Sequence, residues 1–296
     1  MMAVRRVSFD AIDSTNAEAM RRAAAGERGP LWIVAARQSA GRGRQGREWE
    51  SGPGNLYATL LLTSPVPADV AAQTSFVAAL AVFDLAAGVL GEPKPIEPEP
   101  HPQPLPPKGR GATERLSAPS PLGGEGRGGG RRLADDPSRF HPVLALKWPN
   151  DVLLDGAKLS GILIETVAHD APGHTTVAIG MGVNLRHAPE RTRYGATSLA
   201  RHEGRIAPDE AFARLAAAMA ARLADWNDGR GFAVIRRDWT ARAAGLGRRA
   251  SVTMGERTVI GDFTGLASDG ALLLSGPGGQ VHVIHAGEVS LALEAS

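Results

Sequence analysis

Cysteine is absent from this 296-residue sequence. Its absence excludes disulfide bonds, thiolate metal sites and cysteine nucleophiles together. Aromatic residues are scarce, at 5%, and charge of either sign is nearly balanced, with 33 Lys and Arg against 31 Asp and Glu. A net charge of +2 is not the strong basic excess that indicates a nucleic-acid-binding protein. The hydrophobic content of 43% does support a sizeable core.

A targeting or membrane segment is missing as well. The N-terminal residues MMAVRRVSFDAIDSTN contain two arginines but no apolar run after them, so they do not resemble a secretion signal. The longest apolar stretch, residues 76–90, is interrupted by Asp84 and is too short to cross a bilayer. We therefore expect a soluble, cytoplasmic protein with no membrane partner.

One segment has a composition unlike the rest. Residues 92–140 include 11 prolines and 8 glycines among 49 residues, with a single aromatic. Such a segment buries too little apolar surface to offset the entropy of ordering it, so we expect a disordered insertion. Its GRGGGRR run leaves a second interpretation open, a nucleic-acid-binding tail.

Outside that segment, helical and strand-like patterns alternate. Strands are expected at residues 31–37, 55–63 and in four runs between 143 and 184, and helices at residues 67–90 and along the stripe Phe212, Leu215, Met219, Leu223 and Trp226. The dipeptide Asp155-Gly156 predicts a hairpin turn. After Gly245, short strands separated by Gly, Asp and Pro turns predict a small closed β-barrel. The chain as a whole is therefore expected to be α/β, of the α+β type, with a small all-β unit at its C-terminal end.

The stretch DSTN, residues 13–16, precedes another expected helix. Thr15 is predicted as the N-cap, Glu18 completes a capping box, and Gly26 ends the helix. Capping alone would explain Thr15, although a capping residue can also contact a ligand.

The stretch GRGRQG, residues 41–46, matches the glycine fingerprint of dinucleotide-binding folds only in its letters. That fingerprint requires a helix immediately after it, and Gly52, Pro53 and Gly54 forbid one. What remains is a glycine-rich loop carrying Arg42 and Arg44, with Arg47 directly after it. Such a loop can wrap around an anion, or it can be an ordinary solvated surface loop.

Five short stretches do not look like structural filler: DSTN (13–16), RQSAGRGRQGREW (37–49), KWPND (147–151), KLSGILIE (158–165) and GMGVNL (180–185). In this combination and order they resemble the catalytic region of biotin protein ligases, which adenylate biotin with ATP and pass it to a carrier lysine. The resemblance implies a mixed-sheet biotin/lipoate ligase-like catalytic domain over residues 1–245, interrupted by 92–140. It also implies an SH3-like β-barrel over residues 246–296.

The resemblance also implies site residues. The contacts to biotin and its adenylate would come from Ser14, Thr15, Asn16, Gln38, Gly41, Arg42, Gly43, Arg44, Lys158 and Gly161. The nucleotide side would come from Arg47, Trp49, Asn150, Asp151 and Asn184. Lys158 and Arg42 are the expected catalytic cations, ATP would arrive with Mg²⁺, and no protein side chain is predicted as a metal ligand.

Strand geometry raises a difficulty for two of these residues. Lys158 and Gly161 have opposite parity on one expected strand, so in a regular strand they face opposite sides of the sheet. Both can line one pocket only if a bulge or an irregular start occurs near Lys158. Three neighbours have plainer interpretations: Asn150 and Asp151 as turn residues, and Glu165 as a salt bridge at the end of the sheet.

The expected partner is a biotin carboxyl carrier protein or domain of a biotin-dependent carboxylase. DNA binding is not expected, because only about a dozen residues precede DSTN and leave no room for a helix-turn-helix. Two alternatives stay open: another acyl-adenylate ligase such as a lipoate ligase, and an RNA-binding protein that uses its Arg-Gly segments. His282 and His285, three apart on an expected strand, face opposite sides and do not predict a metal site.

Overall fold

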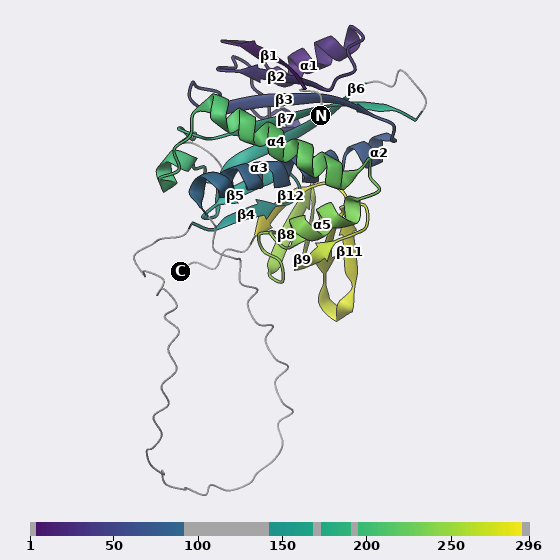
Figure 1. Cartoon of the computed structure of the whole chain (residues 1–296). Coiled ribbons are helices and arrows are strands. Elements are labelled where there is room, and N and C mark those ends of the chain that lie inside the picture. Colours follow the sequence, from purple (N-terminus) through teal and green to yellow (C-terminus); the bar gives the residue numbers. More distant parts are fainter. Residues whose placement is uncertain (1–3, 92–141, 168–172, 191–194, 292–296) are drawn as a thin grey trace, which may run out of the picture.

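A computed structural model of the chain describes residues 4–91, 142–167, 173–190 and 195–291 (Figure 1). The predicted insertion at 92–140 lies outside the described residues. The described residues form a mixed α/β fold, as expected.

The larger sheet has seven strands in the spatial order β1-β2-β3-β7-β6-β5-β4. In chain order these are β1 (Arg5–Phe9), β2 (Leu31–Ala35), β3 (Leu56–Ser64), β4 (Leu144–Lys147), β5 (Asp151–Leu154), β6 (Ala157–Val167) and β7 (Thr175–Val183). Strands β1 and β2 pair in parallel, and the other neighbours are antiparallel. The strand runs predicted between residues 31 and 184 therefore form β2 to β7, which lie next to one another in this sheet.

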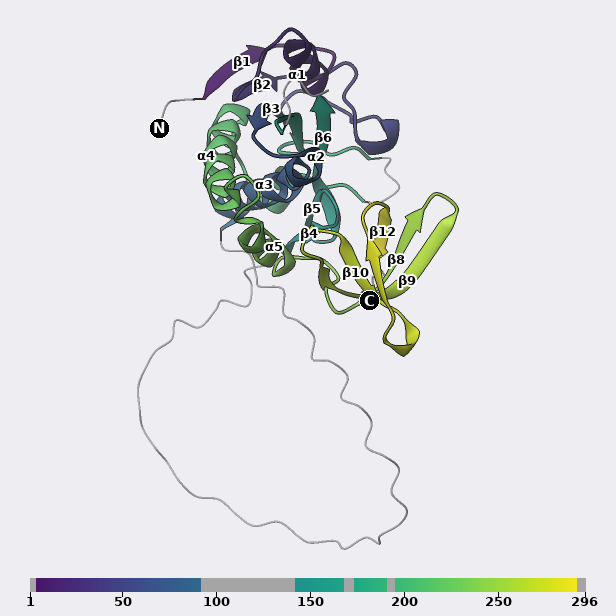
Figure 2. The ribbon, with the colours of Figure 1, turned by 90° about the vertical axis from the view of Figure 1, so that its right-hand side faces the viewer.

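Both faces of this sheet are covered, but unequally. Helices α3 (Thr74–Leu90), α4 (Pro208–Trp226) and α5 (Phe232–Thr240) lie to one side, whereas α1 (Thr15–Ala24) packs at the other side near β2 and β3 (Figure 2). Alternation in β2 matches this arrangement: Trp32 and Val34 join the large core, and Leu31 and Ile33 join the small cluster under α1. The part of the sheet that α1 leaves uncovered is available for a site.

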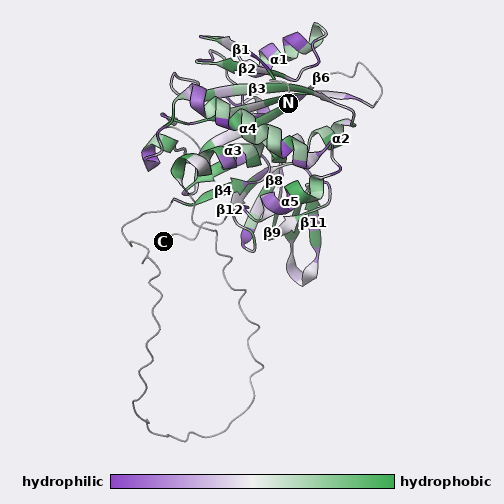
Figure 3. Cartoon of the chain, viewed as in Figure 1, coloured by the Kyte–Doolittle hydropathy of each residue, from purple (hydrophilic) through white to green (hydrophobic). Residues whose placement is uncertain are grey.

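Helix α3 and the short α2 (Ala68–Ala71) together form a segment long and apolar enough, by length and composition, to cross a membrane. In the fold, 67% of its most apolar window is buried. Helix α3 contacts α4, α5 and four strands, and its Asp84 pairs with Arg222 of α4. Figure 3 shows hydrophobic colouring along β2 and β3 and mixed colouring on α1 and α4, as expected for amphipathic outer helices. This segment is accordingly the central core helix of the fold.

The N-terminus of α1 differs from the prediction. Ser14, not Thr15, is the N-cap: its backbone is extended and its hydroxyl accepts a hydrogen bond from Ala17 N. Glu18 consequently falls one position too late for a capping box and instead pairs with Arg21 and Arg22. The adjacent hydroxyls of Ser14 and Thr15 made the register ambiguous by one residue.

The C-terminal unit is a five-stranded antiparallel sheet in the order β11-β10-β9-β8-β12. Its strands are β8 (Arg249–Met254), β9 (Arg257–Leu266), β10 (Leu272–Ser275), β11 (Val281–Ile284) and β12 (Glu288–Leu291). The sequence predicted four strand-like stretches here, the last of which divides into β11 and β12. Among the described residues these two edge strands do not pair, so the predicted closed barrel is not seen. Closure is not needed to bury the inner face, because Phe263 and its apolar neighbours join the large core beside α5.

Candidate active site

A cavity of about 1370 Å³ opens between the N-terminus of α1, the glycine-rich loop, strands β4 to β7 and the C-terminal sheet. It occupies the part of the larger sheet that α1 leaves uncovered. Fourteen of the fifteen predicted site residues line it: Ser14, Thr15, Asn16, Gln38, Arg42, Gly43, Arg44, Arg47, Trp49, Asn150, Asp151, Lys158, Gly161 and Asn184. Segments far apart in the sequence therefore converge on one cavity.

Gly41 is the predicted residue that does not line the cavity. It is buried, and a Cβ atom at this position would lie 2.5 Å from the carbonyl oxygen of Trp49 and 2.6 Å from Ser51 Oγ. Its carbonyl accepts a hydrogen bond from Trp49 N. Gly41 thus allows the two ends of the loop to pack closely, rather than lying in the cavity wall.

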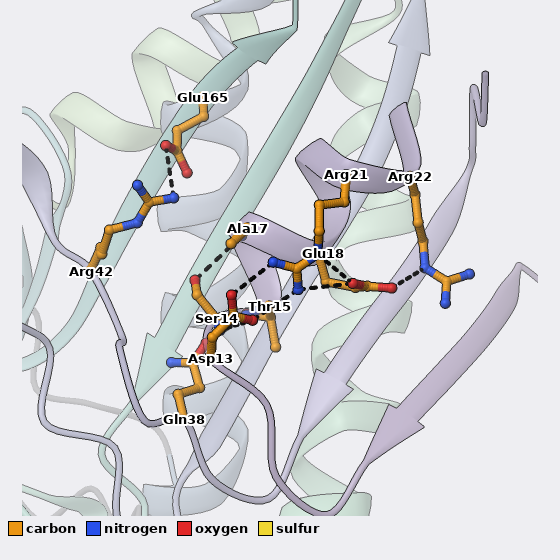
Figure 4. A network of polar contacts seen from close by, with 10 residues as sticks. All are labelled: Asp13, Ser14, Thr15, Ala17, Glu18, Arg21, Arg22, Gln38, Arg42 and Glu165. Carbon is orange, nitrogen blue, oxygen red and sulfur yellow. Dashed lines mark hydrogen bonds and ion pairs between the residues drawn. The ribbon is translucent and has the colours of Figure 1, made fainter. Parts of the chain in front are cut away.

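The first turn of α1 supplies a buried polar cluster (Figure 4). The backbone N–H and hydroxyl of Thr15 both donate to Gln38 Oε1, at 2.8 and 3.0 Å, and Gln38 Nε2 donates to Ser51 Oγ. Thr59 on β3 lies 2.8 Å from Thr15 Oγ1 and 2.7 Å from Asn16 Oδ1. Thr15 therefore does more than occupy a helix end, since its hydrogen bonds fix Gln38 at the cavity wall.

Glu165 connects this cluster to the glycine-rich loop. Its carboxylate accepts a hydrogen bond from Asn16 Nδ2 at 2.8 Å. It also pairs with Arg42 Nη2 at 3.5 Å, the contact drawn in Figure 4. The expected salt bridge near the sheet end is confirmed, and its partner is a predicted site arginine. Glu165 holds Arg42 over the site face of β6.

Lys158 lies beside a β-bulge. Val152 pairs with Ser160 whereas Leu153 pairs with Lys158, so Leu159 is an extra residue in β6. The bulge resolves the parity difficulty: a Cβ atom at Gly161 would lie 3.1 Å from Lys158 Nζ. The irregularity required for both residues to line one pocket is therefore present.

The turn before the bulge follows the sequence prediction. Asp155 and Gly156 have φ values of 49° and 75°, the left-handed conformation that a two-residue hairpin turn of type I′ requires at both central positions. Lys158 Nζ then reaches Asp151 Oδ1 at 2.7 Å, across the β5–β6 pair. Asp151 is consequently a partner of the predicted catalytic cation and not merely a turn residue.

Trp49 closes one side of the cavity and packs over glycines of the sheet, where a larger residue would clash with its indole ring. A Cβ atom at Gly182 would lie 2.6 Å from Trp49 Cε2, and one at Gly161 would lie 3.1 Å from Trp49 Cζ3. Lys158 Nζ lies 5.4 Å from the centre of the indole ring. The glycine at 182 was within a quoted motif, but its role was missed because the sequence does not show which strand faces the indole.

The KWPND stretch contributes one further cation, Lys147, and contacts a second one, Arg44 of the glycine-rich loop. Burial lowers the pKa of Lys147, and nearby Asp151 opposes that shift. Burial likewise lowers the pKa of Arg44, whose Nη1 donates to Asn150 Oδ1 at 3.3 Å. Asn150 Nδ2 in turn donates to the carbonyl of Ile162. Lys147 also lines the cavity, although no site role was predicted for it.

The glycine-rich loop is attached to the C-terminal sheet. Its 3₁₀ turn η1 (Arg44–Gly46) is followed by Arg47, which makes two hydrogen bonds to Glu288 of β12, at 3.0 and 2.7 Å. Glu288 was missed as a cavity residue, because its 241-residue separation from Arg47 left no local signal. The loop and β12 therefore form one wall of the cavity.

Asn184 follows β7 and is 1% exposed. Its Nδ2 donates to the carbonyl of Thr197 at 3.1 Å, whereas Oδ1 has no hydrogen-bond partner among the described residues. An unsatisfied buried acceptor is costly, so a donor from a ligand would be favourable here. This geometry suits the predicted place of Asn184 on the nucleotide side.

Carboxylates accompany the cations that line the cavity. The described residues contain no group of three or more His, Asp or Glu side chains able to hold a metal ion. Two of the carboxylates that line the cavity face cations, Asp151 facing Lys158 and Glu288 facing Arg47. The cavity thus combines several cations with carboxylates, two of which are paired.

Two family models match the sequence. Residues 8–184 match the biotin/lipoate A/B protein ligase family, and residues 245–292 match the biotin protein ligase C-terminal domain. The second match begins where the strands of the C-terminal sheet begin.

Curated relatives and solved structures agree with these matches. A biotin–[acetyl-CoA-carboxylase] ligase of Paracoccus denitrificans is 39% identical over 94% of this chain and 96% of its own length. The enzyme of the same description from Mycobacterium tuberculosis is 30% identical over 93% of this chain and 85% of its own. In fold, the chain is similar to a biotin protein ligase from Aquifex aeolicus in complex with biotin and ATP, with a TM-score of 0.68, 22% identity and coverage of 97% and 98%.

Proposed function

Because this chain belongs to the biotin/lipoate A/B protein ligase family, we propose that its cavity activates biotin with ATP and transfers biotin to a protein lysine. The observation that carries the proposal is the meeting of Lys158, the arginine-bearing loop and Trp49 in one cavity, in a chain 39% identical to a named biotin ligase. The chain is an enzyme, an ATP-dependent biotin protein ligase.

The first step joins two anions. A carboxylate oxygen of biotin attacks the α-phosphorus of ATP, the bond to the β-phosphate bridging oxygen breaks, and pyrophosphate leaves. Repulsion between the reactants opposes this approach, and one ion pair at 4 Å contributes about 4 kcal/mol at an effective dielectric of 20. Several fixed cations are therefore needed, and Arg42, Arg44, Lys147 and Lys158 line the cavity.

Lys158 is the residue that we assign to the reacting groups. It emerges from the bulge toward the cavity and is paired with Asp151 at 2.7 Å. When the anions bind, we expect its ammonium group to turn from Asp151 to the biotin carboxylate and the α-phosphate. Arg42, held by Glu165, would approach the same groups from the loop side.

The loop and Trp49 supply enclosure. Gly43 N donates to the carbonyl of Arg47 at 2.7 Å, which folds the loop back on itself beside the cavity. Trp49 lies over Gly161 and Gly182 and would stack against the adenine. A closed loop would keep water from the mixed anhydride until the carrier arrives.

The second step is acyl transfer. The neutral amine of the carrier lysine attacks the acyl carbon of biotinyl-5′-AMP, the bond from that carbon to the phosphate oxygen breaks, and AMP leaves. Loss of a proton from the new amide nitrogen completes the reaction. The carrier is proposed to be a biotin carboxyl carrier domain, in keeping with the carboxylase named in the relatives' descriptions.

Three further features belong to this proposal. Mg²⁺ is assigned to the substrate, as MgATP, because its oxygen ligands can come from the phosphates and water. The catalytic domain is assigned to residues 1–245 and the C-terminal domain to 246–296. We place the reaction in the cytoplasm and assign no DNA-binding role.

The test is formation of AMP and pyrophosphate that requires both biotin and ATP. Lipoate and octanoate are supplied as competitors, because the family model includes lipoate ligases. We expect biotin, and neither lipoate nor octanoate, to support turnover with ATP. Transfer of labelled biotin to a carrier domain should follow. Activation of lipoate in preference to biotin would contradict the proposed substrate.

A further inference from the structure

Three side chains behind the cavity form a continuous hydrogen-bonded chain. His202 Nδ1 lies 3.1 Å from Asp155 Oδ2, and His202 Nε2 lies 2.9 Å from Thr197 Oγ1. Asp155 Oδ1 also accepts a hydrogen bond from Val143 N at 2.7 Å. With the proton on Nδ1, the imidazole donates to Asp155 and accepts from the Thr197 hydroxyl.

This arrangement of carboxylate, imidazole and hydroxyl resembles a hydrolytic triad in its chemistry, but not in its location. Thr197 is 5% exposed, and none of the three side chains lines the cavity. An attacking hydroxyl must reach a substrate, and this one faces the protein interior. The chain of hydrogen bonds must act through the residues that it holds.

The backbone of Thr197 is hydrogen-bonded to Lys158, beside the bulge in β6. Lys158 N donates to the carbonyl of Gly195 at 2.8 Å, and Thr197 N donates to the carbonyl of Lys158 at 2.9 Å. Residues 195–197 thus lie beside Lys158 like a short parallel strand, with a bridge between Lys158 and Ala196. This segment satisfies both backbone polar groups of Lys158 at the point where the regular pairing of β6 is interrupted.

The same segment also connects to the other half of the site. Asn184 Nδ2 donates to the carbonyl of Thr197, and Asn184 N donates to the carbonyl of the bulge residue Leu159 at 3.0 Å. Three hydrogen bonds therefore join Thr197, Asn184 and the Lys158–Leu159 peptide in a closed ring. Fixing Thr197 fixes both the lysine bulge and the amide on the nucleotide side.

We propose that Asp155, His202 and Thr197 form a positioning relay that holds the bulge and so aims the Lys158 ammonium group into the cavity. Asp155 is anchored at the β5–β6 turn, His202 lies in the 3₁₀ turn η2 (Leu199–His202), and Thr197 transmits their position to Lys158. The inference rests on the proposed function, because it assigns the relay to the lysine of that reaction. These three are positioning residues, and Lys158 alone among the four touches substrate.

Two variants of Thr197 test whether its hydroxyl is needed. Thr197→Val removes the relay contact with little change of shape, whereas Thr197→Ser retains it. Displacing a catalytic group by about 1 Å can cost about 100-fold in rate, so we expect Thr197→Val and His202→Ala to lower kcat for AMP formation about 10- to 100-fold. KM for biotin and ATP should change less than about threefold, and Thr197→Ser should retain kcat within about threefold.

A matched control is present in the C-terminal sheet. His285 Nδ1 lies 3.4 Å from Asp269 Oδ2, and Asp269 Oδ1 accepts a turn N–H from Ala271, so the local contacts imitate those of His202 and Asp155. This pair is exposed and does not line the cavity. His285→Ala should retain the wild-type kcat and KM.

The outcomes separate the two proposals. If the wild type is active and Thr197→Val and His202→Ala have the same kcat, the relay proposal is overturned and the proposed function stands. The same holds if Thr197→Ser loses as much kcat as Thr197→Val. A wild type that forms no AMP from biotin would overturn the proposed function and the relay with it. If His202→Ala does not fold, as judged by thermal unfolding, the Val and Ser variants of Thr197 decide the question.

Discussion

At the scale of single residues, the position of Lys158 depends on a backbone irregularity. A regular strand would direct it to the α3 side of the sheet, among apolar residues such as Ile162. The bulge at Leu159 brings its ammonium group beside Gly161 and Asp151 instead. Burying a charge on the apolar side would be costly, which gives the bulge a physical reason.

Lys158→Met is predicted to abolish adenylate formation, because it removes the charge and keeps most of the stem. We expect biotin-dependent pyrophosphate release to fall about 10³-fold or more, with thermal unfolding within a few degrees of wild type. Lys158→Arg is the companion variant, since it retains charge but not shape. Activity of Lys158→Met near the wild-type level would contradict the assignment.

The ion pair between Asp13 and Arg21 is predicted to make the free energy of unfolding depend on pH. Two hydrogen bonds from Arg21 hold its pKa at about 2, below the ordinary value of 3.8. A carboxylate with a lowered pKa stabilises the fold above its unfolded pKa, and this contribution is lost as pH falls from about 4 to about 2. Urea unfolding at these pH values should show a shallower acid loss in Asp13→Asn. An identical slope in both proteins would argue against the pair, which is partly exposed and therefore modest in effect.

The motifs found in the sequence predicted which residues line the cavity better than they predicted the contacts of those residues. Side chains such as Gln38, Arg42 and Asn150 were assigned by resemblance, and all three line the cavity. Thr59 was not predicted, because its role depends on β3 passing beneath α1. Such pairings between distant segments leave no periodic or local pattern in the sequence.

At the scale of elements, one arginine joins the three large helices. Arg222 of α4 makes two hydrogen bonds to Asp84 of α3 and one to Asp238 at the C-terminal end of α5. Its side chain is 14% exposed. The apolar stripe of α4 predicted the packing, but not this polar contact on its flank.

Arg222→Ala is predicted to lower the free energy of unfolding by about 2–3 kcal/mol, since it leaves two carboxylates without their shared partner. Arg214→Ala on the same helix is the control. Its i,i+4 pair with Glu210 and its hydrogen bond to the carbonyl of Gly88 are both exposed, and together they should contribute about 1 kcal/mol or less. Urea denaturation measures both, and equal effects would show that Arg222 adds no more than a surface pair.

Secondary structure was predicted well where a turn or an apolar run determined it. The left-handed Asp155-Gly156 turn appears where its sequence places it, and the β7 run forms the centre of the sheet. The edge strand β1 was not predicted, because its five residues are mostly exposed and include two arginines. Edge strands bury little and therefore carry little apolar pattern.

At the scale of the whole molecule, the sequence has one long segment between the helices and strands that build the site. Helix α3 ends at Leu90 and β4 starts at Leu144, with residues 92–140 between them in the sequence. The described residues on either side of that range supply the cavity lining given above.

Replacing residues 92–140 by a short Gly/Ser linker is predicted to change kcat/KM less than about threefold. Each doubling of loop length changes the closure free energy by only about 0.6 kcal/mol, so stability should also change little. Steady-state AMP formation and thermal unfolding of the deletion variant provide the check. A tenfold loss of kcat/KM would assign the segment a role. Polynucleotide binding that disappears with the segment would support the alternative RNA-binding interpretation.

The placement of Trp49 has a consequence for how ligands can be observed. Of the five tryptophans, Trp32, Trp226 and Trp239 are buried away from the cavity, whereas Trp49 and Trp148 line it, and Trp148 is only 4% exposed. A nucleotide stacking on the more accessible Trp49 indole would alter its emission, while the three tryptophans away from the cavity would stay unchanged. The intrinsic fluorescence of the unlabelled enzyme should therefore act as a titration signal for adenylate occupancy, and Trp49→Phe should remove most of that signal.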